Sequence, residues 1–438
     1  MVLAVLRRYL GVQGVLLAFV AVDVIGVVLV FELVRLDWIG IAAAVVAVLI
    51  TVVGFRTGSS ERARLGTLAA LVFLLLFLPL ATVVILEPAN AAVIDGVLLN
   101  DAAADRLLSG HDPYVGDYLN TQMRAFYLSD VPVNFGLVRM VYMPGMALLD
   151  VPLRLLHNSH ANLSWLFLPG LVALAAAAWS LGLRPAEKQA TLIAVVLSPI
   201  FQEDYLYLLN DVFFLAPALA GIAFLRRNRP LAAGAMLGLS LAMKQQAVLF
   251  LPLLGLYALL NLDRRSQLRM AAGFTAVLAV LVGPFLLWDP KAFVSGTAAF
   301  FYGSGVDSYP IRGIGLQGLL LRAGVIPNRW DAFPSAQIQV PLLVIVLIFA
   351  ARDLRRGWRW PRFWFWLGLE ALAVFAFGRV LAPNYLDLCL AFFLVAFASA
   401  LVDETPAPAV VGDVDRPPRL GGVIRATTEH DPGDLPAT

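Results

Sequence analysis

Long runs of apolar residues separated by short polar loops dominate the chain. Twelve such runs stand at residues 10–31, 37–54, 65–86, 163–182, 190–208, 212–225, 231–243, 247–260, 270–288, 337–351, 363–380 and 385–401. About 20 apolar residues form a helix that crosses the hydrocarbon core of a bilayer. The pattern therefore predicts an all-α polytopic membrane protein with a bundle of about twelve transmembrane helices.

The composition supports the same class. Hydrophobic residues make up 60% of the 438 and charged residues 14%, whereas soluble domains have about 45–50% apolar and about 25% charged residues. The arginines lie between apolar runs rather than on one face, which argues against a nucleic-acid partner. The single cysteine, Cys389, excludes an intrachain disulfide.

Basic residues occur in alternate loops and predict the orientation. The basic loops contain Arg7 and Arg8; Arg56, Arg62 and Arg64; Arg184 and Lys188; Arg226, Arg227 and Arg229; Arg264, Arg265 and Arg269; and Arg352, Arg355, Arg356, Arg359 and Arg362. Short loops rich in Lys and Arg stay in the cytoplasm. We therefore expect a cell-membrane protein with both termini cytoplasmic and large outer loops at residues 87–162 and 289–337.

Three segments need separate interpretation. Residues 142–156, in the first outer loop, are expected to form a juxtamembrane helix at the membrane interface. The Pro-containing tail, residues 402–438, reads as a disordered cytoplasmic segment. Residues 231–260 are apolar except near Lys244, yet both ends are basic, which predicts a hairpin with Lys244 near its outer tip. An ionisable group inside an apolar stretch favours a functional role, and snorkelling to the interface is the alternative.

The outer loops hold the candidate carboxylates. Asp95 follows the third span and has no evident cap or turn role, so chemistry is favoured there. Asn100 or Asp101 is expected to cap a short helix ending near Leu108, and for Asp101 this role is favoured over chemistry. In the turn before the sixth span, Glu203 and Asp204 are equally consistent with solvation or function. Asp211 begins that span, where a helix-dipole role and a functional role are comparable.

Arginines of the outer face are candidate ligands of a lipid phosphate. Arg312 and Arg322 lie next to apolar segments of the second outer loop, and Arg379 closes the outer end of the eleventh span. Arginine suits bidentate phosphate contacts, while interfacial anchoring is the alternative, strongest for Arg322. His157 and His160 lack the neighbours of a zinc site, so no metal ligands are expected. The sequence contains no phosphate-binding loop motif, so the use of a nucleotide inside the cell is not expected.

Several short motifs occur in an order that resembles one superfamily. They are Asp95 after an early span, G-x-D-P-Y at 110–114, Y-x-P at 142–144, Asp211 at the start of a span, the Gly-rich stretch 232–254, and residues 288–293 followed by 317–322. In this order they resemble the GT-C superfamily of membrane glycosyltransferases, most of all the bacterial polyprenyl-phosphate-mannose-dependent mannosyltransferases. The likeness covers residues 65–401, so residues 1–64 are interpreted as an extension of two transmembrane helices.

The resemblance implies an inverting sugar transfer on the extracytoplasmic face. The donor would be a lipid-linked sugar such as polyprenyl-phosphate-mannose, and the acceptor a cell-envelope glycan, a glycolipid or a protein. Asp95 is the expected general base and Asp211 the second catalytic residue. The expected substrate-binding residues are Asp101, Tyr114, Tyr142, Glu203, Asp204, Lys244, Arg312, Arg322 and Arg379. No other cofactor is required, and the choice between mannose and arabinofuranose, like metal dependence, stays open.

Two other classes of function compete with this interpretation. Twelve spans with Asp23 and Glu370 in mid-span are compatible with a transporter or lipid flippase. Such proteins commonly contain internal repeats, and this sequence has none that we detect. A non-catalytic assembly protein is the third possibility, against which the large polar outer loops argue.

Overall fold

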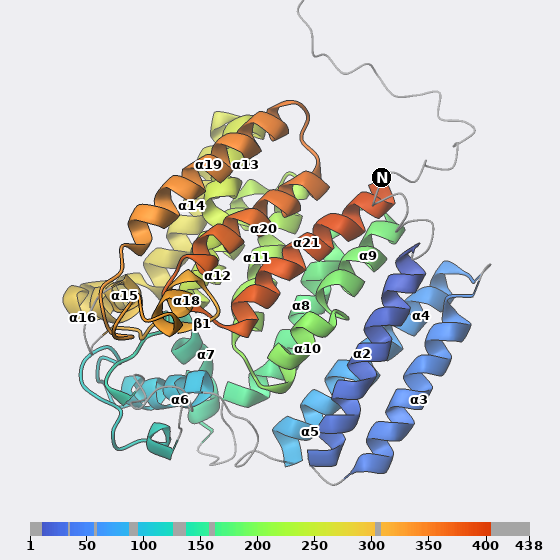
Figure 1. Cartoon of the computed structure of the whole chain (residues 1–438), viewed down its shortest axis with the longest axis horizontal. Helices are drawn as coiled ribbons and strands as arrows, with labels where there is room; N and C mark the ends of the chain where they lie inside the picture. The colour runs from blue at the N-terminus through green and yellow to red at the C-terminus, as the bar shows by residue number, and fades with distance from the viewer. Residues whose placement is uncertain are drawn as a thin grey trace, which may run out of the picture.

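The computed structural model describes residues 11–33, 36–56, 59–86, 95–125, 137–156, 163–302 and 308–403. The protein is almost wholly helical in this part (Figure 1). The two strands of the described part, β1 (Arg312–Gly313) and β2 (Val380–Leu381), pair in parallel. Most of the expected cytoplasmic tail, residues 404–438, lies outside the described residues.

The first helices form one flank of the bundle, drawn in blue in Figure 1. They are α2 (Gly11–Leu33), α3 (Asp37–Gly54), α4 (Glu61–Val72), the π-helical turn η1 (Phe73–Phe77) and α5 (Leu78–Leu86). The elements α4, η1 and α5 form one continuous helix, and Ser60 is its N-cap residue. The Ser60 side chain accepts a hydrogen bond from the Ala63 backbone N–H at 3.2 Å, which satisfies one of the free donors of the first turn. The flank joins the rest of the bundle through contacts of α2 with α10 and α21.

The remaining bundle contains eleven further helical elements. These are α8 (Phe167–Leu181), α9 (Pro185–Val195), α10 (Pro199–Leu206), α11 (Asp211–Arg226), α12 (Pro230–Met243), η5 (Gln245–Phe250), α13 (Leu251–Asn261), α14 (Arg264–Leu281), α19 (Ser335–Arg355), α20 (Trp360–Ala376) and α21 (Pro383–Asp403).

Six helices of the described part are long and apolar enough to cross a membrane. They are Gly14–Glu32, Asp37–Gly54, Glu61–Ile85, Leu163–Leu181, Ser335–Arg355 and Pro383–Val402. The chain is therefore a membrane protein, as its hydropathy predicts. The other apolar runs form helices that are shorter or less apolar, so the count of twelve spans stays a prediction.

Short helices gather at one end of the bundle, at the lower left of Figure 1. They are α6 (Asp95–Leu108), η2 (Gln122–Ala125), α7 (Pro144–Arg154), η4 (Leu163–Leu166), α15 (Gly283–Trp288), α16 (Pro290–Val294), η6 (Ser295–Ala299), α17 (Phe300–Tyr302) and α18 (Leu316–Arg322). All but two of them belong to the two loops that the sequence predicts on the outside; η4 and α15 instead fall within the predicted spans 163–182 and 270–288. Helix α7 begins at Pro144, where the sequence places a juxtamembrane helix.

The chain reverses direction at Lys244. Its ammonium lies 2.7 Å from the carboxylate of Asp211, the first residue of α11. At the other end of the bundle, the ring of Tyr257 in α13 lies 5.6 Å from that of Trp360, which the Arg226 guanidinium at the end of α11 also covers. Helices α12 and α13 therefore run in opposite directions. The reversal predicted for residues 231–260 is therefore observed, and the position of Lys244 at an outer tip stays a prediction.

Glycines allow α12 and α14 to cross at close range. A Cβ atom at Gly234 would stand 1.8 Å from the carbonyl oxygen of Met270, and one at Gly273 would stand 2.2 Å from that of Leu231. Small residues at such crossings let two backbones approach in a membrane, where packing replaces the hydrophobic effect as the cohesive force. The Gly-rich character of residues 232–254 thus has a packing role.

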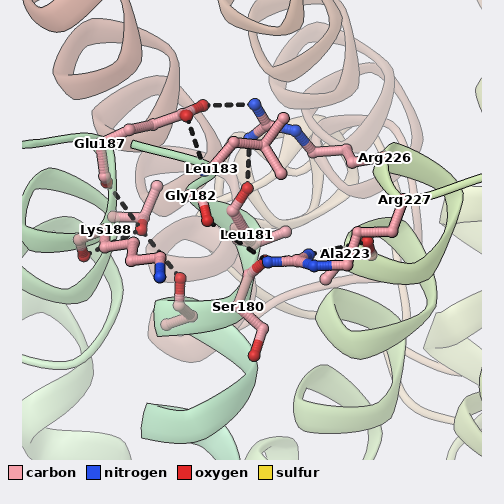
Figure 2. A network of polar contacts seen from close by, with 11 residues as sticks. Ser180, Leu181, Gly182, Leu183, Glu187, Lys188, Ala223, Arg226 and Arg227 are labelled. Atoms are coloured by element: carbon pink, nitrogen blue, oxygen red, sulfur yellow. Dashed lines mark hydrogen bonds and ion pairs between the residues drawn. The ribbon is translucent and has the colours of Figure 1, made fainter. Parts of the chain in front are cut away.

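A buried polar clasp joins α8, α9 and α11 (Figure 2), at the end of α11 that is opposite to Asp211. Glu187 and Arg226, from α9 and α11, form an ion pair at 2.5 Å, with each side chain 5% exposed. The same guanidinium donates to the carbonyl of Leu181, and the neighbouring Arg227 donates to that of Ser180. Together these contacts satisfy carbonyl groups at the carboxyl end of α8, which would otherwise be left without partners.

Candidate active site

The Lys244–Asp211 ion pair is the centre of the site. Both residues are 4% exposed, and the Lys244 Nζ lies 2.7 Å from Asp211 Oδ1. The second carboxylate oxygen accepts a hydrogen bond from Asn384 Nδ2 at 2.9 Å. Asp211 is the first residue of α11, where the positive end of the helix dipole also favours its negative charge.

Two further side chains extend this network toward α21. Gln246 Nε2 donates to the Tyr385 hydroxyl at 2.9 Å. The Tyr385 ring stacks on Phe375, with centroids 4.6 Å apart and planes at 10°. Tyr385 is also within electrostatic range of Asp211 and Asp95. The hairpin tip and the start of α21 therefore meet at the same place.

Asp95 approaches this place from α6. It is the first residue of the helix and is partly exposed. Burial raises the pKa of the Asp95 carboxyl above its ordinary value, and the nearby positive charges of Arg312 and Lys244 oppose the rise. A carboxylate with a raised pKa is a stronger base when it is ionised.

Two tyrosines complete what we call the polar cluster. Burial raises the pKa of Tyr142 and of Tyr309, and both phenols lie within electrostatic range of Asp95. Tyr309 also forms a side-chain hydrogen bond with Arg312. The polar cluster thus consists of Asp95, Tyr142, Asp211, Lys244, Gln246, Tyr309, Arg312, Asn384 and Tyr385.

The strand pair holds Arg312 in place. In β1 and β2, Arg312 pairs with Val380, and the Arg312 backbone N–H donates to the carbonyl of Arg379 at 3.0 Å. The Arg379 guanidinium donates to the carbonyls of Tyr309 at 2.7 Å and of Asp331 at 3.0 Å. Arg379 therefore fixes the segment that carries Tyr309 and Arg312. Its contacts are those of a positioning residue.

An apolar cavity of about 420 Å³ adjoins the polar cluster. Gln246 and Tyr385 belong to its wall, so the cavity and the cluster share residues. The remaining lining residues are Met143, Leu241, Gln245, Val248, Leu249, Phe293, Thr297, Ala298, Phe301, Gln339, Val374, Phe375, Gly378, Arg379 and Val380. Most of this wall is apolar, which suits a hydrocarbon chain.

Other predicted residues lie elsewhere or have structural contacts. Tyr114 is 5% exposed, its ring packs edge-on against Phe293 at 5.0 Å, and its hydroxyl donates to the Tyr142 carbonyl at 2.8 Å. Arg322 is more exposed and donates to the Gly313 carbonyl at 3.1 Å. These two residues support the loops around the polar cluster.

The carboxylates predicted between residues 203 and 211 do not all lie at the polar cluster. Asp204 is 2% exposed and lies on α10 beside Tyr205, and Tyr205 is within electrostatic range of both Asp204 and Asp23 of α2. The backbone of Glu203 is helical, but its side chain lies outside the described part. Of the described carboxylates in this range, Asp204 and Asp211, the structure brings Asp211 to the polar cluster.

The expected helix cap at Asn100 or Asp101 is wrong. Helix α6 begins at Asp95 and places Asp101 in its interior. There the Asp101 Oδ1 accepts a hydrogen bond from the Leu163 backbone N–H at 3.0 Å. Asp150 of α7 lies against it at 0% exposure. Burial and the neighbouring Asp101 raise the pKa of Asp150 to about 8, so the two carboxyls share a proton near neutral pH.

Gln246, Tyr309, Asn384 and Tyr385 are not among the site residues that the sequence predicts. Each lies near a predicted residue, Lys244, Arg312 or Arg379, and this proximity is the only signal of them in the sequence. Among the residues that the structure describes, no group of three His, Cys, Asp or Glu side chains is placed to hold a metal ion.

The comparisons with known proteins bear on the identity of this site. No curated protein and no solved structure matches the chain. The sequence profile of Glycosyltransferase family 87 matches residues 141–383, more than half of the 438 residues. The matched segment begins just before Tyr142, contains Asp211, Lys244 and Arg312, and ends just before Asn384. The chain belongs to Glycosyltransferase family 87 and is a membrane glycosyltransferase.

Proposed function

We propose that the protein is a GT-C-type enzyme that transfers a sugar, with mannose preferred, from a polyprenyl-phosphate donor to an acceptor hydroxyl. The observation that carries this proposal is the meeting of two carboxylates and two cations, Asp95, Asp211, Lys244 and Arg312, beside an apolar cavity. A lipid-linked sugar needs this combination, because its phosphate is anionic while its prenyl chain must leave water.

The apolar cavity is suited to the first isoprene units of the donor. Burial of apolar surface contributes about 25 cal/mol per Å², so a prenyl chain in this cavity gains binding energy without polar contacts. Gln246 and Tyr385 lie where the cavity meets the polar cluster. We place the bond between the prenyl chain and the phosphate of the donor at this point. Lys244 and Arg312 then face the phosphate oxygens.

Asp95 is the general base of the proposed reaction. Its carboxylate accepts the proton of the acceptor hydroxyl as that oxygen bonds to the anomeric carbon of the donor sugar. The bond between the anomeric carbon and the phosphate oxygen breaks, and polyprenyl phosphate leaves with the electron pair. Attack opposite to the leaving group inverts the configuration. Lys244 and Arg312 stabilise the charge that develops on the leaving phosphate.

Asp211 has a supporting role in this scheme. Its carboxylate holds Lys244 at 2.7 Å and receives Asn384 at 2.9 Å. A lysine fixed in this way costs less reorganisation when the phosphate charge develops. Asp211 therefore acts on the donor through Lys244.

The distribution of basic loops supports an extracytoplasmic site. The buried clasp at Arg226 marks the end of α11 that joins a basic loop, and the polar cluster lies at the opposite end of the same helix. Because basic loops stay in the cytoplasm, the polar cluster belongs to the outer side.

The test is transfer of labelled mannose from a short-chain polyprenyl-phosphate-mannose by the purified enzyme. We expect Asp95→Asn to lower kcat about 10²–10⁴-fold, which is the usual contribution of a general base, with little change in the donor KM. Asp117→Asn, an exposed aspartate of the same outer region, is the matched control and keeps wild-type activity. Retention of transfer by Asp95→Asn refutes the catalytic assignment.

A further inference from the structure

A polar cavity of about 580 Å³ lies against α6, and it shares no lining residue with the polar cluster. Leu98 and Ala102 supply the apolar part of its wall. The polar lining residues are Asp101, Asp105, Arg106, Ser109, His111, Asn120, Thr121, Gln122 and Arg154. The cavity therefore offers many hydrogen-bonding groups to a ligand of small-molecule size.

The wall of this cavity contains two acidic and two basic side chains, and both arginines already have hydrogen-bond partners within the protein. Arg154 binds Asp105 with two hydrogen bonds, Nε to Oδ1 at 2.8 Å and Nη2 to Oδ2 at 2.6 Å. The Arg106 guanidinium donates to the carbonyls of Asp117, at 2.8 Å, and Val115. An anionic ligand would have to displace these partners. A neutral ligand rich in hydroxyl groups fits the wall better, since hydroxyls both donate and accept.

The carboxyl of Asp101 in this wall is held by a hydrogen bond from the protein backbone. Asp101 is 7% exposed, and the Leu163 backbone N–H holds its Oδ1 at 3.0 Å. Asp150 lies behind it at 0% exposure. A polar group that is held in this way is preorganised for hydrogen bonding to a ligand, because little conformational freedom is lost on binding.

The geometry of α6 connects this cavity with Asp95. Leu98, Ala102 and Asp105 recur at intervals of three or four residues, which places them on one face of the helix. Asp95 precedes Leu98 by three residues and extends the same face. With a rise of 1.5 Å per residue, Asp95 and Asp105 are about 15 Å apart along the axis. A ligand would need to extend about 15 Å along this face to meet both positions.

We propose that the cavity at Asp101, Asp105 and Arg154 is a subsite for inner sugar units of the acceptor, so that the acceptor is a glycan chain of two or more sugars. The inference rests on the proposed function and narrows its acceptor class. The terminal hydroxyl lies at Asp95 while the preceding units occupy the cavity. Longer acceptors then bind more tightly than a single sugar.

The test compares kcat/KM for methyl mannoside, methyl mannobioside and methyl mannotrioside, with the corresponding arabinofuranosides in parallel. We expect the ratio of two-unit to one-unit kcat/KM to be about tenfold in the wild type, which corresponds to two or three net hydrogen bonds. Asn120→Ala and Gln122→Ala change exposed side chains of the wall and are each expected to reduce this ratio about threefold. Gln337→Ala, an exposed glutamine outside the cavity, keeps the wild-type ratio.

A binding measurement separates this proposal from the proposed function. Saturation-transfer NMR with methyl mannobioside and the detergent-solubilised enzyme needs no turnover. We expect a signal in the wild type that Gln122→Ala weakens and Gln337→Ala does not. Equal ratios and equal signals in all variants overturn the subsite. Loss of all transfer from the lipid donor, with the binding difference retained, overturns the donor assignment and leaves the carbohydrate site standing.

Discussion

Replacing Lys244 by methionine removes one charge of the buried ion pair while it keeps a side chain of similar length. Asp211 then retains Asn384 as its hydrogen-bond partner but loses the ammonium at 2.7 Å. At this separation the Coulomb attraction is about 6 kcal/mol for an effective dielectric constant of about 20. Because the desolvation of Asp211 is no longer offset, we expect a net destabilisation of about 3–5 kcal/mol.

This free energy converts into a measurable shift of the thermal midpoint. For 438 residues the entropy of unfolding is about 0.9 kcal/mol/K. A loss of about 3–5 kcal/mol therefore lowers Tm by about 3–5 °C. The measurement is a thermal melt of the detergent-solubilised enzyme, with transfer activity assayed on the same preparation below the transition.

The double variant separates the structural from the functional role of Lys244. Asp211→Asn in the Lys244→Met background removes the uncompensated carboxylate, so Tm is expected to return to within about 1 °C of the wild type. Transfer activity is not expected to return, because the donor phosphate still lacks its cation. Recovery of activity together with stability contradicts the phosphate role, and an unchanged Tm in the single variant contradicts the buried ion pair.

Two further predictions concern stability. Asp150 has a folded pKa of about 8 against the ordinary 3.8, so the stability of the wild type is expected to fall as pH rises from about 4 to about 8, by up to 1.4 kcal/mol per pH unit. Asp150→Asn is expected to flatten this pH dependence of Tm. A wild-type Tm that is constant over this range refutes the shared proton. Gly234→Ala is expected to lower Tm by several degrees, because its Cβ would stand 1.8 Å from the Met270 carbonyl oxygen. Gly255→Ala, whose Cβ meets nothing within 4 Å, is the control, and equal melting of the two variants refutes the close crossing.

The sequence predicts the parts of the site that carry charge. Lys244 interrupts an apolar run, Asp211 begins a helix, and Asp95 has no competing local role, so each is conspicuous without a structure. The hairpin at Lys244 follows from the same pattern, because one orientation must satisfy the basic residues at both ends. These inferences depend on charge in an apolar sequence, which is a strong signal.

The contacts between distant segments leave no such signal. Asn384 meets Asp211 across 173 positions and Gln246 meets Tyr385 across 139, and amide and phenol groups are too common to be selected individually. The cap expected at Asp101 fails for a related reason. Helix α6 starts six residues earlier, so Asp101 is free to meet Asp150 of α7, and only tertiary structure supplies that partner.

The shortness of α12 fits the proposal that the polar cluster binds a lipid-linked donor. Its fourteen residues from Pro230 to Met243 rise about 21 Å, about 9 Å less than the hydrocarbon core of a bilayer. In the proposed orientation the chain turns at Lys244 before it reaches the outer interface, and α7 packs against this end of α12, where Gly145 meets Ala242. This orientation would place Lys244 and Asp211, both 4% exposed, in a region of low dielectric, where a fixed cation attracts phosphate more strongly than it does in water. A lipid-linked donor can bring its phosphate to this depth while its chain stays in the apolar cavity, whereas a water-soluble nucleotide sugar would have to leave its hydration shell without an apolar group to offset the cost.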